Sequence, residues 1–364
     1  MSQSVLHQVT VGATLGDAIT DHALLLRRWL RERGLVSNIY AHSYHPALEG
    51  EVLPFSTYRP QRAERFVIYH HSTGSSVAER LMTLPVELMM VYHNITPPEF
   101  FASVNPALAE EMQEGRRQLY RLRERTLLAL GVSPFNELDL KHAGYLRTGV
   151  LPLALDESQY QLPNDSDLVA RFKEQGPLLL FVGRLVPNKK YEDLLKLLYY
   201  YRRIDPKAQL LLVGGQWVSE YERWLKDLAH DLGLGGAVHF TGHVTQQQMV
   251  TYYRLADLYV SMSEHEGFGK PLIESMYLDL PVLAYAAAGV PYTLREAGVQ
   301  VHRKEFEAIA ELVDLLVTDL PLRERILAGQ RQRVQAFLET QVREQLYEYL
   351  TLVSHAEHVA LRLP

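Results

Sequence analysis

The sequence predicts an α/β protein built from two Rossmann-like domains, and three observations support this prediction. Short apolar runs recur along the chain and alternate with amphipathic stretches, which is typical of buried parallel strands joined by crossover helices. The alternation stops once, in a stretch rich in proline, aspartate, serine and glutamine. The chain of 364 residues is also longer than most chains that fold around a single hydrophobic core, so two domains are expected.

We expect a strand wherever a short apolar run is followed by glycine, histidine or serine. In the first half, these runs are residues 5–11, 66–70 and 88–93, with 127–132 as a weaker candidate. In the second half, they are residues 178–182, 210–213, 238–241, 258–262 and 282–285. The amphipathic stretches between them predict helices, for example at residues 19–33, 191–202, 220–232 and 246–256.

The interruption of the pattern predicts an interdomain linker at residues 151–175, because turn-forming residues dominate it. We therefore expect a first domain at residues 1–155 and a second at residues 165–335. The tail at residues 322–353 predicts two helices whose outer faces carry glutamate, glutamine and arginine.

Composition excludes several classes of protein. A net charge of −6 and a pI near 6.2 argue against nucleic acid as a main partner. The absence of cysteine excludes disulfides, thiolate metal sites and a cysteine nucleophile. The first residues lack the pattern of a signal peptide, and no apolar stretch approaches the roughly 20 residues that span a bilayer. We expect a cytoplasmic protein.

Contact with the inner face of a membrane remains an alternative. Residues 112–130 carry five arginines among regularly spaced leucines. This pattern predicts either a basic amphipathic helix for an anionic surface or a solvated arginine-rich face, and we favour the solvated face.

Glycine and polar residues follow the predicted strands at their carboxyl ends. In open α/β sheets, ligands bind beyond these ends. The sequence therefore predicts that chemistry takes place in one cleft between two domains. The residues concerned are 12–17, 70–72, 93–94, 183–184, 214–215, 241–243 and 263–266.

Residues 263–276 form the most informative of these segments. Glu266 and Glu274 flank a glycine-rich turn, and Pro271 lies where a helix would begin, a position that proline suits. Two carboxylates at such a place can each accept hydrogen bonds from vicinal hydroxyls. Backbone N–H groups at a helix N-terminus bind phosphate or sugar oxygens, and here we expect them to come from Gly267, Phe268 and Gly269.

This segment resembles the Glu-x7-Glu signature of the retaining glycosyltransferases of family 4. Residues 181–189 resemble the Gly-Arg-Leu-x-Pro-x-Lys stretch of that family, and residues 210–215, 238–243, 281–285 and 289–291 follow in its order and spacing. The resemblance is dense from residue 177 to 298 and thinner before it. It implies the GT-B fold, in which two Rossmann-like domains face each other across a cleft, with the acceptor domain first and the nucleotide-sugar donor domain second. It also implies that a last helix, at about residues 342–364, joins the first domain.

The resemblance also implies roles for individual residues. Glu266 would contact the transferred sugar, and Glu274 would contact the ribose hydroxyls. Without the resemblance, Glu266 would be interpreted as an exposed acid in a loop, and Glu274 as the partner of Lys270 in a salt bridge on the helix surface. Arg184 and Lys189 would bind the donor diphosphate, for which a guanidinium fork and a mobile ammonium are suited. His243, at the end of a resembling stretch, is expected among the donor-binding residues.

Three positions depart from the family pattern. Lys190 stands where the family often has glycine, and we interpret it as solvated. Lys270 stands where the family usually has an apolar residue, so we expect it to pair with Glu274 or to approach a phosphate. Tyr292 replaces a glutamate that often follows Val-Pro.

Among the 15 histidines, His93 matches the histidine of the first domain that lies near the reacting carbon. The alternative is a strand-end histidine bonded to a loop carbonyl. The pair His70 and His71 suggests a metal site, but no third ligand follows at a recognisable spacing, so we expect no metal. Gly16 could let the backbone approach the donor diphosphate or the acceptor, or it could belong to an ordinary turn with Asp17 as a helix cap.

We therefore expect a retaining hexosyltransferase that takes its sugar from a nucleotide-diphosphate donor, without a cofactor, and passes it to a glycan or glycolipid hydroxyl. Resemblance to enzymes of bacterial polysaccharide synthesis favours GDP-mannose, and UDP-sugars remain open. The alternatives are a nucleotide-sugar 2-epimerase on the same scaffold, a nicotinamide oxidoreductase, which the weak glycine loop at Gly12 disfavours, and an inactive binding partner of another transferase.

Overall fold

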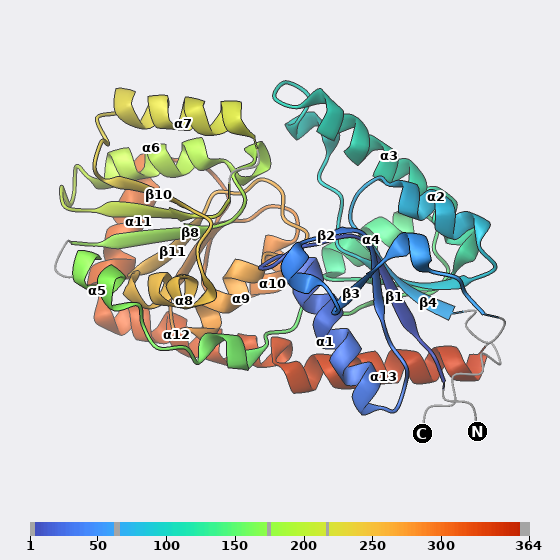
Figure 1. The fold of residues 1–364 in the computed structure, drawn as a ribbon. Coiled ribbons are helices and arrows are strands. Elements are labelled where there is room, and N and C mark those ends of the chain that lie inside the picture. The colour runs from blue at the N-terminus through green and yellow to red at the C-terminus, as the bar shows by residue number, and fades with distance from the viewer. Residues whose placement is uncertain (1–3, 62–65, 173–175, 216–217, 357–364) are drawn as a thin grey trace. The chain divides into compact units, whose positions relative to one another are not determined.

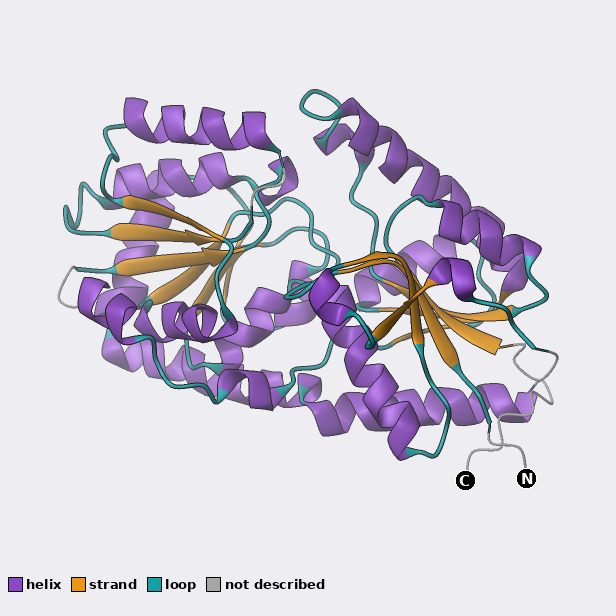
Figure 2. Ribbon diagram, viewed as in Figure 1, coloured by secondary structure: helices purple, strands orange, loops and turns teal. Residues whose placement is uncertain are grey.

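The computed structural model describes residues 4–61, 66–172, 176–215 and 218–356. The chain divides into two compact units. The first consists of Met1–Glu99, Pro106–Ala154 and Phe337–Pro364, and the second of Phe100–Asn105 and Leu155–Ala336. Each unit is an α/β layer structure with its own sheet (Figure 1; Figure 2).

The sheet of the first unit has seven parallel strands among the described residues, in the order β3-β2-β1-β4-β5-β6-β7. The order changes direction between β1 and β4, which is a topological switch point of the kind where ligands bind. The strands are β1 (His7–Ala13), β2 (Ile39–Tyr44), β3 (Val52–Pro54), β4 (Phe66–His71), β5 (Glu87–Tyr92), β6 (Thr126–Gly131) and β7 (Thr148–Val150).

The helices of the first unit come from segments far apart in the sequence. They are α1 (Ala18–Glu32), α2 (Ser76–Thr83), α3 (Pro106–Leu122), α4 (Pro134–His142) and α13 (Glu339–Ala356). The last helix, α13, crosses α1 and contacts it near Trp29 (Figure 1). Glu339 accepts a hydrogen bond of 2.7 Å from Trp29 Nε1, and the Tyr347 hydroxyl donates one of 2.9 Å to the carbonyl of Trp29. Residues 357–364 of the expected last helix lie outside the described residues.

The sheet of the second unit has six parallel strands in the described part of the chain, in the order β10-β9-β8-β11-β12-β13. Its switch point lies between β8 and β11. The strands are β8 (Leu178–Val182), β9 (Gln209–Val213), β10 (Val238–Gly242), β11 (Leu258–Ser261), β12 (Val282–Tyr285) and β13 (Val299–Val301). Strands β8, β9 and β11 are buried along their whole length, as their continuous apolar sequences require.

Helices cover both faces of this second sheet, with α6 and α7 on one face and α8 and α9 on the other (Figure 1). The helices of the second unit are α5 (Ser166–Phe172), α6 (Tyr191–Tyr201), α7 (Ser219–Asp231), α8 (Gln246–Leu255), α9 (Lys270–Tyr277), α10 (Val290–Leu294), α11 (Phe306–Thr318) and α12 (Leu320–Val334).

The predicted α/β fold with two Rossmann-like sheets is confirmed, and each strand predicted from an apolar run is present within a residue or two of its expected bounds. Four strands were not predicted, namely β2, β3, β7 and β13. Strand β2 turns polar at His42, and the other three are three-residue strands at sheet edges, so neither the length nor the polarity of a buried strand marks them.

The predicted linker at residues 151–175 is shorter than expected. Residues Ser166–Phe172 form helix α5, which packs on α8. The backbone N–H of Asp165 donates to Thr251 Oγ1 at 2.9 Å, and the Asp165 carboxylate accepts from the N–H of Leu168 at 3.1 Å. The polar sequence that suggests a linker therefore contains a helix cap. Residues 173–175 lie outside the described part of the chain.

The predicted basic helix at residues 112–130 is also wrong in its extent. Helix α3 ends at Leu122, and strand β6 begins at Thr126. The arginines of α3 are engaged within the unit, so the structure does not support a basic face for a membrane. Arg116 donates to the Ile95 carbonyl at 2.7 Å, Arg117 pairs with Glu110 and Glu114, and Arg121 pairs with Glu79. Over the described ranges, no helix has the length and apolar character needed to cross a bilayer.

Candidate functional site

The second unit brings together a lysine and a glutamate from two different strand ends. Lys189 ends the 3₁₀ turn Pro187–Lys189 that follows β8, and Glu266 lies in the loop after β11. Lys189 Nζ is 2.6 Å from both carboxylate oxygens of Glu266, and the two side chains are only 17% and 12% exposed. A charge-assisted pair of this length is strong, so the predicted phosphate-binding cation and the predicted sugar-binding acid hold each other.

Backbone contacts explain why this pair forms. The N–H of Glu264 donates to the Asn188 carbonyl at 2.9 Å, and Asn188 Nδ2 donates to the His265 carbonyl at 3.0 Å. These two bonds join the loop after β8 to the loop after β11. The pairing of Lys189 with Glu266 therefore follows from adjacency of β8 and β11 in the sheet.

Lys190 is not solvated as expected. Its backbone is left-handed, with φ of 54°, a conformation that glycine adopts without strain and that accounts for the glycine of the family pattern. Its ammonium lies 3.0 Å from Glu192 and 3.8 Å from Glu264. Burial opposes the charge, but these carboxylates together raise the pKa of Lys190 above its usual value.

The glycine-rich turn leads into α9 as the sequence predicts. Gly269 is the N-cap of α9 with φ of 83°, and Pro271 lies in the first turn. A neighbouring segment fixes the turn, because the N–H of Gly289 donates to the Glu266 carbonyl at 2.8 Å. A Cβ on Gly289 would lie 2.5 Å from the carbonyl oxygen of Gly267, so only glycine allows this approach. Thr293 Oγ1 donates to the Phe268 carbonyl at 2.6 Å.

Glu274 projects from α9 into a buried site rather than onto the surface of the helix. One carboxylate oxygen accepts a hydrogen bond from the Tyr160 hydroxyl at 2.7 Å, and the other accepts one from the Tyr253 hydroxyl at 2.6 Å. Glu274 is 9% exposed, and Lys270 Nζ lies 3.8 Å away. Burial and the nearby carboxylate raise the pKa of Tyr253 well above its usual value, which keeps this hydroxyl protonated as a donor. Neither tyrosine was singled out from the sequence.

The remaining predicted residues of the second unit lie at the ends of its other strands. A Cβ on Gly214 would lie 1.8 Å from the carbonyl oxygen of Gly183, and one on Gly215 would lie 2.9 Å from the ring of His243. The backbones after β8 and β9 and the ring after β10 are therefore in close contact. Arg184 is exposed just after β8.

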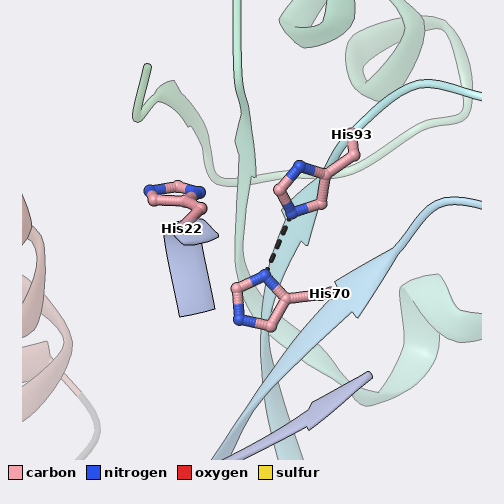
Figure 3. A group of neighbouring side chains, drawn as sticks. All are labelled: His22, His70 and His93. Atoms are coloured by element: carbon pink, nitrogen blue, oxygen red, sulfur yellow. Dashed lines mark hydrogen bonds between the residues drawn. The ribbon is translucent and has the colours of Figure 1, made fainter. Parts of the chain in front are cut away.

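The first unit gathers three histidines at its strand ends (Figure 3). His70 is the penultimate residue of β4, His93 directly follows β5, and His22 lies on α1. His70 Nδ1 is 3.0 Å from His93 Nε2, and the ring of His22 meets those of His70 and His93 edge to face at 6.1 Å and 5.7 Å. His71 faces another way and bonds the Gly115 carbonyl through Nε2 at 3.0 Å.

The sequence suggested a metal site only at the pair His70 and His71, whereas the structure gathers a different set of rings. One ring nitrogen from each of His22, His70 and His93 lies within 4.8 Å of the other two, so these residues could hold a metal ion. His71 is not part of this group, and the other two rings of the group come from α1, which precedes the pair in the sequence, and from the residue after β5. His22 could have been found by its spacing, because it shares the buried face of α1 with Leu26 and Trp29.

Burial keeps these histidines neutral. It lowers the pKa of His70 to about 3 and, against an opposing bond to the Gly115 carbonyl, that of His71 to about 4. Burial first, and then the neighbouring rings, hold the pKa of His93 well below its usual value. The site in the first unit thus consists of neutral donors and acceptors, in contrast to the charges of the second unit.

The loop at Gly16 has the structure of a helix start. Asp17 caps α1 by accepting from the N–H groups of Ile19 and Thr20 at 3.2 Å and 3.1 Å. Gly16 has φ of 71°, and nothing lies within 4 Å of the position its Cβ would take. Its backbone conformation explains the glycine.

Comparison with known proteins is consistent with this geometry. Residues 166–333 match the family described as "Glycosyl transferases group 1". The mannosylfructose-phosphate synthase of Agrobacterium fabrum is 32% identical over 149 residues, which cover 39% of this chain and 33% of that protein. A GDP-mannose-dependent alpha-(1-6)-phosphatidylinositol monomannoside mannosyltransferase of Mycobacterium tuberculosis is 30% identical over 152 residues, 39% of each protein. These matches span a third to two fifths of the length of the relatives.

Solved structures match over nearly the whole chain. HepE from Anabaena, crystallised with UDP and glucose, has a TM-score of 0.78 at 18% identity and covers 96% of this chain and 100% of its own. Sucrose-phosphate synthase from Thermosynechococcus elongatus has a TM-score of 0.75 at 19% identity and covers 98% and 100%. At such identities the likeness establishes the fold. The chain thus has the fold of these solved structures, and residues 166–333, which lie in the second unit, match the glycosyl transferases group 1 family.

Proposed function

We propose that this protein is a retaining glycosyltransferase that moves a hexose from a nucleotide-diphosphate sugar to a hydroxyl group of a glycan or a lipid-linked acceptor. The observation that supports this most is the Lys189–Glu266 pair, 2.6 Å long, at the switch point of a sheet whose sequence matches the glycosyl transferases group 1 family. A cation at such a point can stabilise the negative charge that transfer creates on the diphosphate, and an acid there can hold the sugar ring, which becomes positive.

The chemistry follows from those charges. Breaking the anomeric C–O bond leaves negative charge on the diphosphate and positive charge on the sugar ring. Lys189, Arg184 and the N-terminus of α9 stabilise the first by preorganised electrostatics. Glu266 positions the sugar rather than attacking it. The incoming hydroxyl approaches on the face of the leaving group and passes its proton to a phosphate oxygen, so no protein group acts as general base.

The contacts of the free protein suggest how the donor is accommodated. The Lys189 ammonium has three donors, and Glu266 occupies two of its directions, which leaves one for a phosphate oxygen. Each oxygen of Glu274 accepts one tyrosine hydroxyl and retains a second lone pair for a ribose hydroxyl. His93 of the first unit contacts the transferred sugar, and Gly16 and His243 lie against the donor.

The test compares two substitutions with a charge-matched control. Arg184→Ala and Glu266→Gln should each lower donor turnover by orders of magnitude, whereas Arg223→Ala, on the exposed side of α7, should not. Product NMR should show that the anomeric configuration of the donor is kept. Wild-type rates in both site variants would refute the assignment of the site, and an inverted product would refute the retaining mechanism.

Names of relatives support GDP-mannose as the first donor to test, since one is a GDP-mannose-dependent mannosyltransferase, while HepE is solved with UDP-glucose. A thermal-shift panel of UDP, GDP, ADP and their sugars separates these donors, because a ligand that binds only the folded state raises its melting temperature. An epimerase would release an altered sugar without any acceptor, and finding such a product would replace the transferase proposal.

A further inference from the structure

A chain of hydrogen bonds runs through the interior of the first unit and ends at His93. Gln8, on β1, donates from Nε2 to the carbonyl of Ala23 at 3.0 Å. Its Oε1 is 2.9 Å from His70 Nε2, and His70 Nδ1 is 3.0 Å from His93 Nε2 (Figure 3). Gln8 and His70 are fully buried. An interior glutamine is costly unless its amide is bonded at both ends, and here it is.

The carbonyl of Ala23 fixes the direction of this chain. A carbonyl can only accept, so the amide nitrogen of Gln8 must face it, because the reverse orientation would set two acceptors 3.0 Å apart. The Oε1 of Gln8 then faces His70 and can only accept, so His70 carries its proton on Nε2.

The protons of the two rings follow from that step. A fully buried ring such as that of His70 stays neutral because burial disfavours the charged form, and a neutral imidazole has one N–H, so Nδ1 of His70 is a bare acceptor. The proton in the bond between the rings therefore belongs to Nε2 of His93. Nδ1 of His93 is left with a lone pair and no proton.

We propose that Gln8 and His70 are positioning residues that hold His93 in the Nε2–H tautomer, so that His93 Nδ1 accepts a hydrogen bond from a hydroxyl of the sugar. This inference rests on the proposed function, in which His93 contacts the transferred sugar. Exposure supports it, because His93 is the one member of the three-histidine group that is not fully buried. A ring free to take either tautomer would present an acceptor only part of the time.

A metal ion bound by the same three rings is the rival account. Two nitrogens that ligate one tetrahedral zinc lie about 3.3 Å apart, given Zn–N distances of about 2.0–2.1 Å. The facing nitrogens of His70 and His93 are 3.0 Å apart, which is an ordinary hydrogen-bond length. Zinc would have to replace the proton between them, so the two accounts predict different nitrogen spectra.

The first experiment reads the tautomer directly. Long-range ¹H–¹⁵N spectra of the full chain labelled at histidine, assigned with His93→Gln, should show His93 with bare Nδ1 and protonated Nε2 at neutral pH. The opposite tautomer would overturn the inference. Addition of one equivalent of Zn²⁺ after chelation should leave the three ring signals in place, whereas stoichiometric shifts of His22, His70 and His93 together would establish the metal centre instead.

The second experiment removes the support and leaves His93 intact. Gln8→Met keeps the length of the side chain but removes the acceptor, so His93 should populate both tautomers and kcat/KM for the donor should fall about tenfold. Gln8→Glu, protonated in this buried site, can still donate to Ala23 and accept from His70, and should restore the single tautomer. Gln118→Met is the matched control, because it removes another buried glutamine of the first unit, one that bonds Ser75 and Glu79 instead.

The two experiments separate the inference from the proposed function. A wild-type tautomer in Gln8→Met would overturn the positioning role whatever the activity. Unchanged turnover in His93→Ala would instead remove the sugar contact from the proposed function, while the spectrum of the wild-type ring would still decide the tautomer.

Discussion

The two units carry different kinds of side chain at the carboxyl ends of their strands. The second unit presents charges, a 2.6 Å ion pair of Lys189 with Glu266 and a buried Glu274 held by two tyrosines. The first unit presents neutral rings, because burial depresses the pKa values of His70 and His93. Under the proposed function, the charges of the second unit would bind the diphosphate and the neutral rings of the first unit would bind sugar hydroxyls.

Removal of the cation gives the largest expected effect. Lys189→Met should lower kcat/KM for the donor by about 10²–10³, the usual result of removing one preorganised charge from a transition state. The double variant with Glu266→Gln should cost little more than either single change, because residues that act as a unit are not additive. Steady-state kinetics with Lys196→Met, a half-exposed lysine paired to Asp193, provides the control. Fully additive losses would contradict the pairing.

The sequence predicts the charged residues of the second unit, which we call the charged half, better than the neutral histidines of the first unit, which we call the neutral half. The reason is that the charged residues belong to short local motifs. Lys189, Glu266 and Glu274 stand within short motifs whose spacing places them at strand ends and on one helix. His22, His70 and His93 come from helix α1, strand β4 and the residue after β5, which are far apart in the sequence and meet only in the fold. The sequence contains one sign of their partner Gln8, which is the single amide side chain in the apolar run at residues 5–11. A buried strand tolerates an amide only where other groups of the fold form hydrogen bonds with it.

The same limit applies within the charged half. The motifs predicted the strand-end acids but not Tyr160 and Tyr253, since aromatic residues in a polar loop and on an amphipathic helix look like ordinary packing. The hydrogen bonds that join Asn188 to the loop of His265 depend on which strands are neighbours, and no local pattern contains that information.

A second expected effect concerns how the neutral half is built. A Cβ on Gly115 would lie 2.5 Å from the backbone nitrogen of Gly74, so Gly115→Ala must separate α3 from the loop after β4. We expect a loss of stability on the order of 3 kcal/mol, measured by thermal or denaturant unfolding. Gly235→Ala, where nothing lies within 4 Å, is the matched control in the second unit. Equal melting temperatures for both variants would show that the loop can move away at little cost.

A third effect is the dependence of stability on pH. The pKa of His70 is about 3 in the folded state and ordinarily about 6.5, so below pH 6.5 the unfolded chain takes up a proton that the folded chain refuses. Stability is therefore complete above pH 6.5 and falls as the pH drops, by up to about 1.4 kcal/mol per pH unit for each such histidine. Urea unfolding at pH 7.5, 6.5 and 5.5 should show this slope of the free energy of unfolding against pH. In His70→Gln the slope should be smaller, because one proton fewer is taken up on unfolding. An unchanged slope would mean that His70 titrates normally.

The smallest expected effect tests whether the tyrosines position Glu274 for a ligand or only stabilise it. Tyr253→Phe removes one hydrogen bond to the carboxylate, worth about 1 kcal/mol, and should raise the KM for the donor about fivefold with kcat little changed, because the ribose is bound equally in the ground and transition states. Tyr252→Phe, on the same helix and buried against Phe172, is the control. If Tyr253→Phe lowers the melting temperature and leaves the KM unchanged, Tyr253 contributes to folding alone. The second unit would then recognise the nucleotide without needing Tyr253 to orient Glu274.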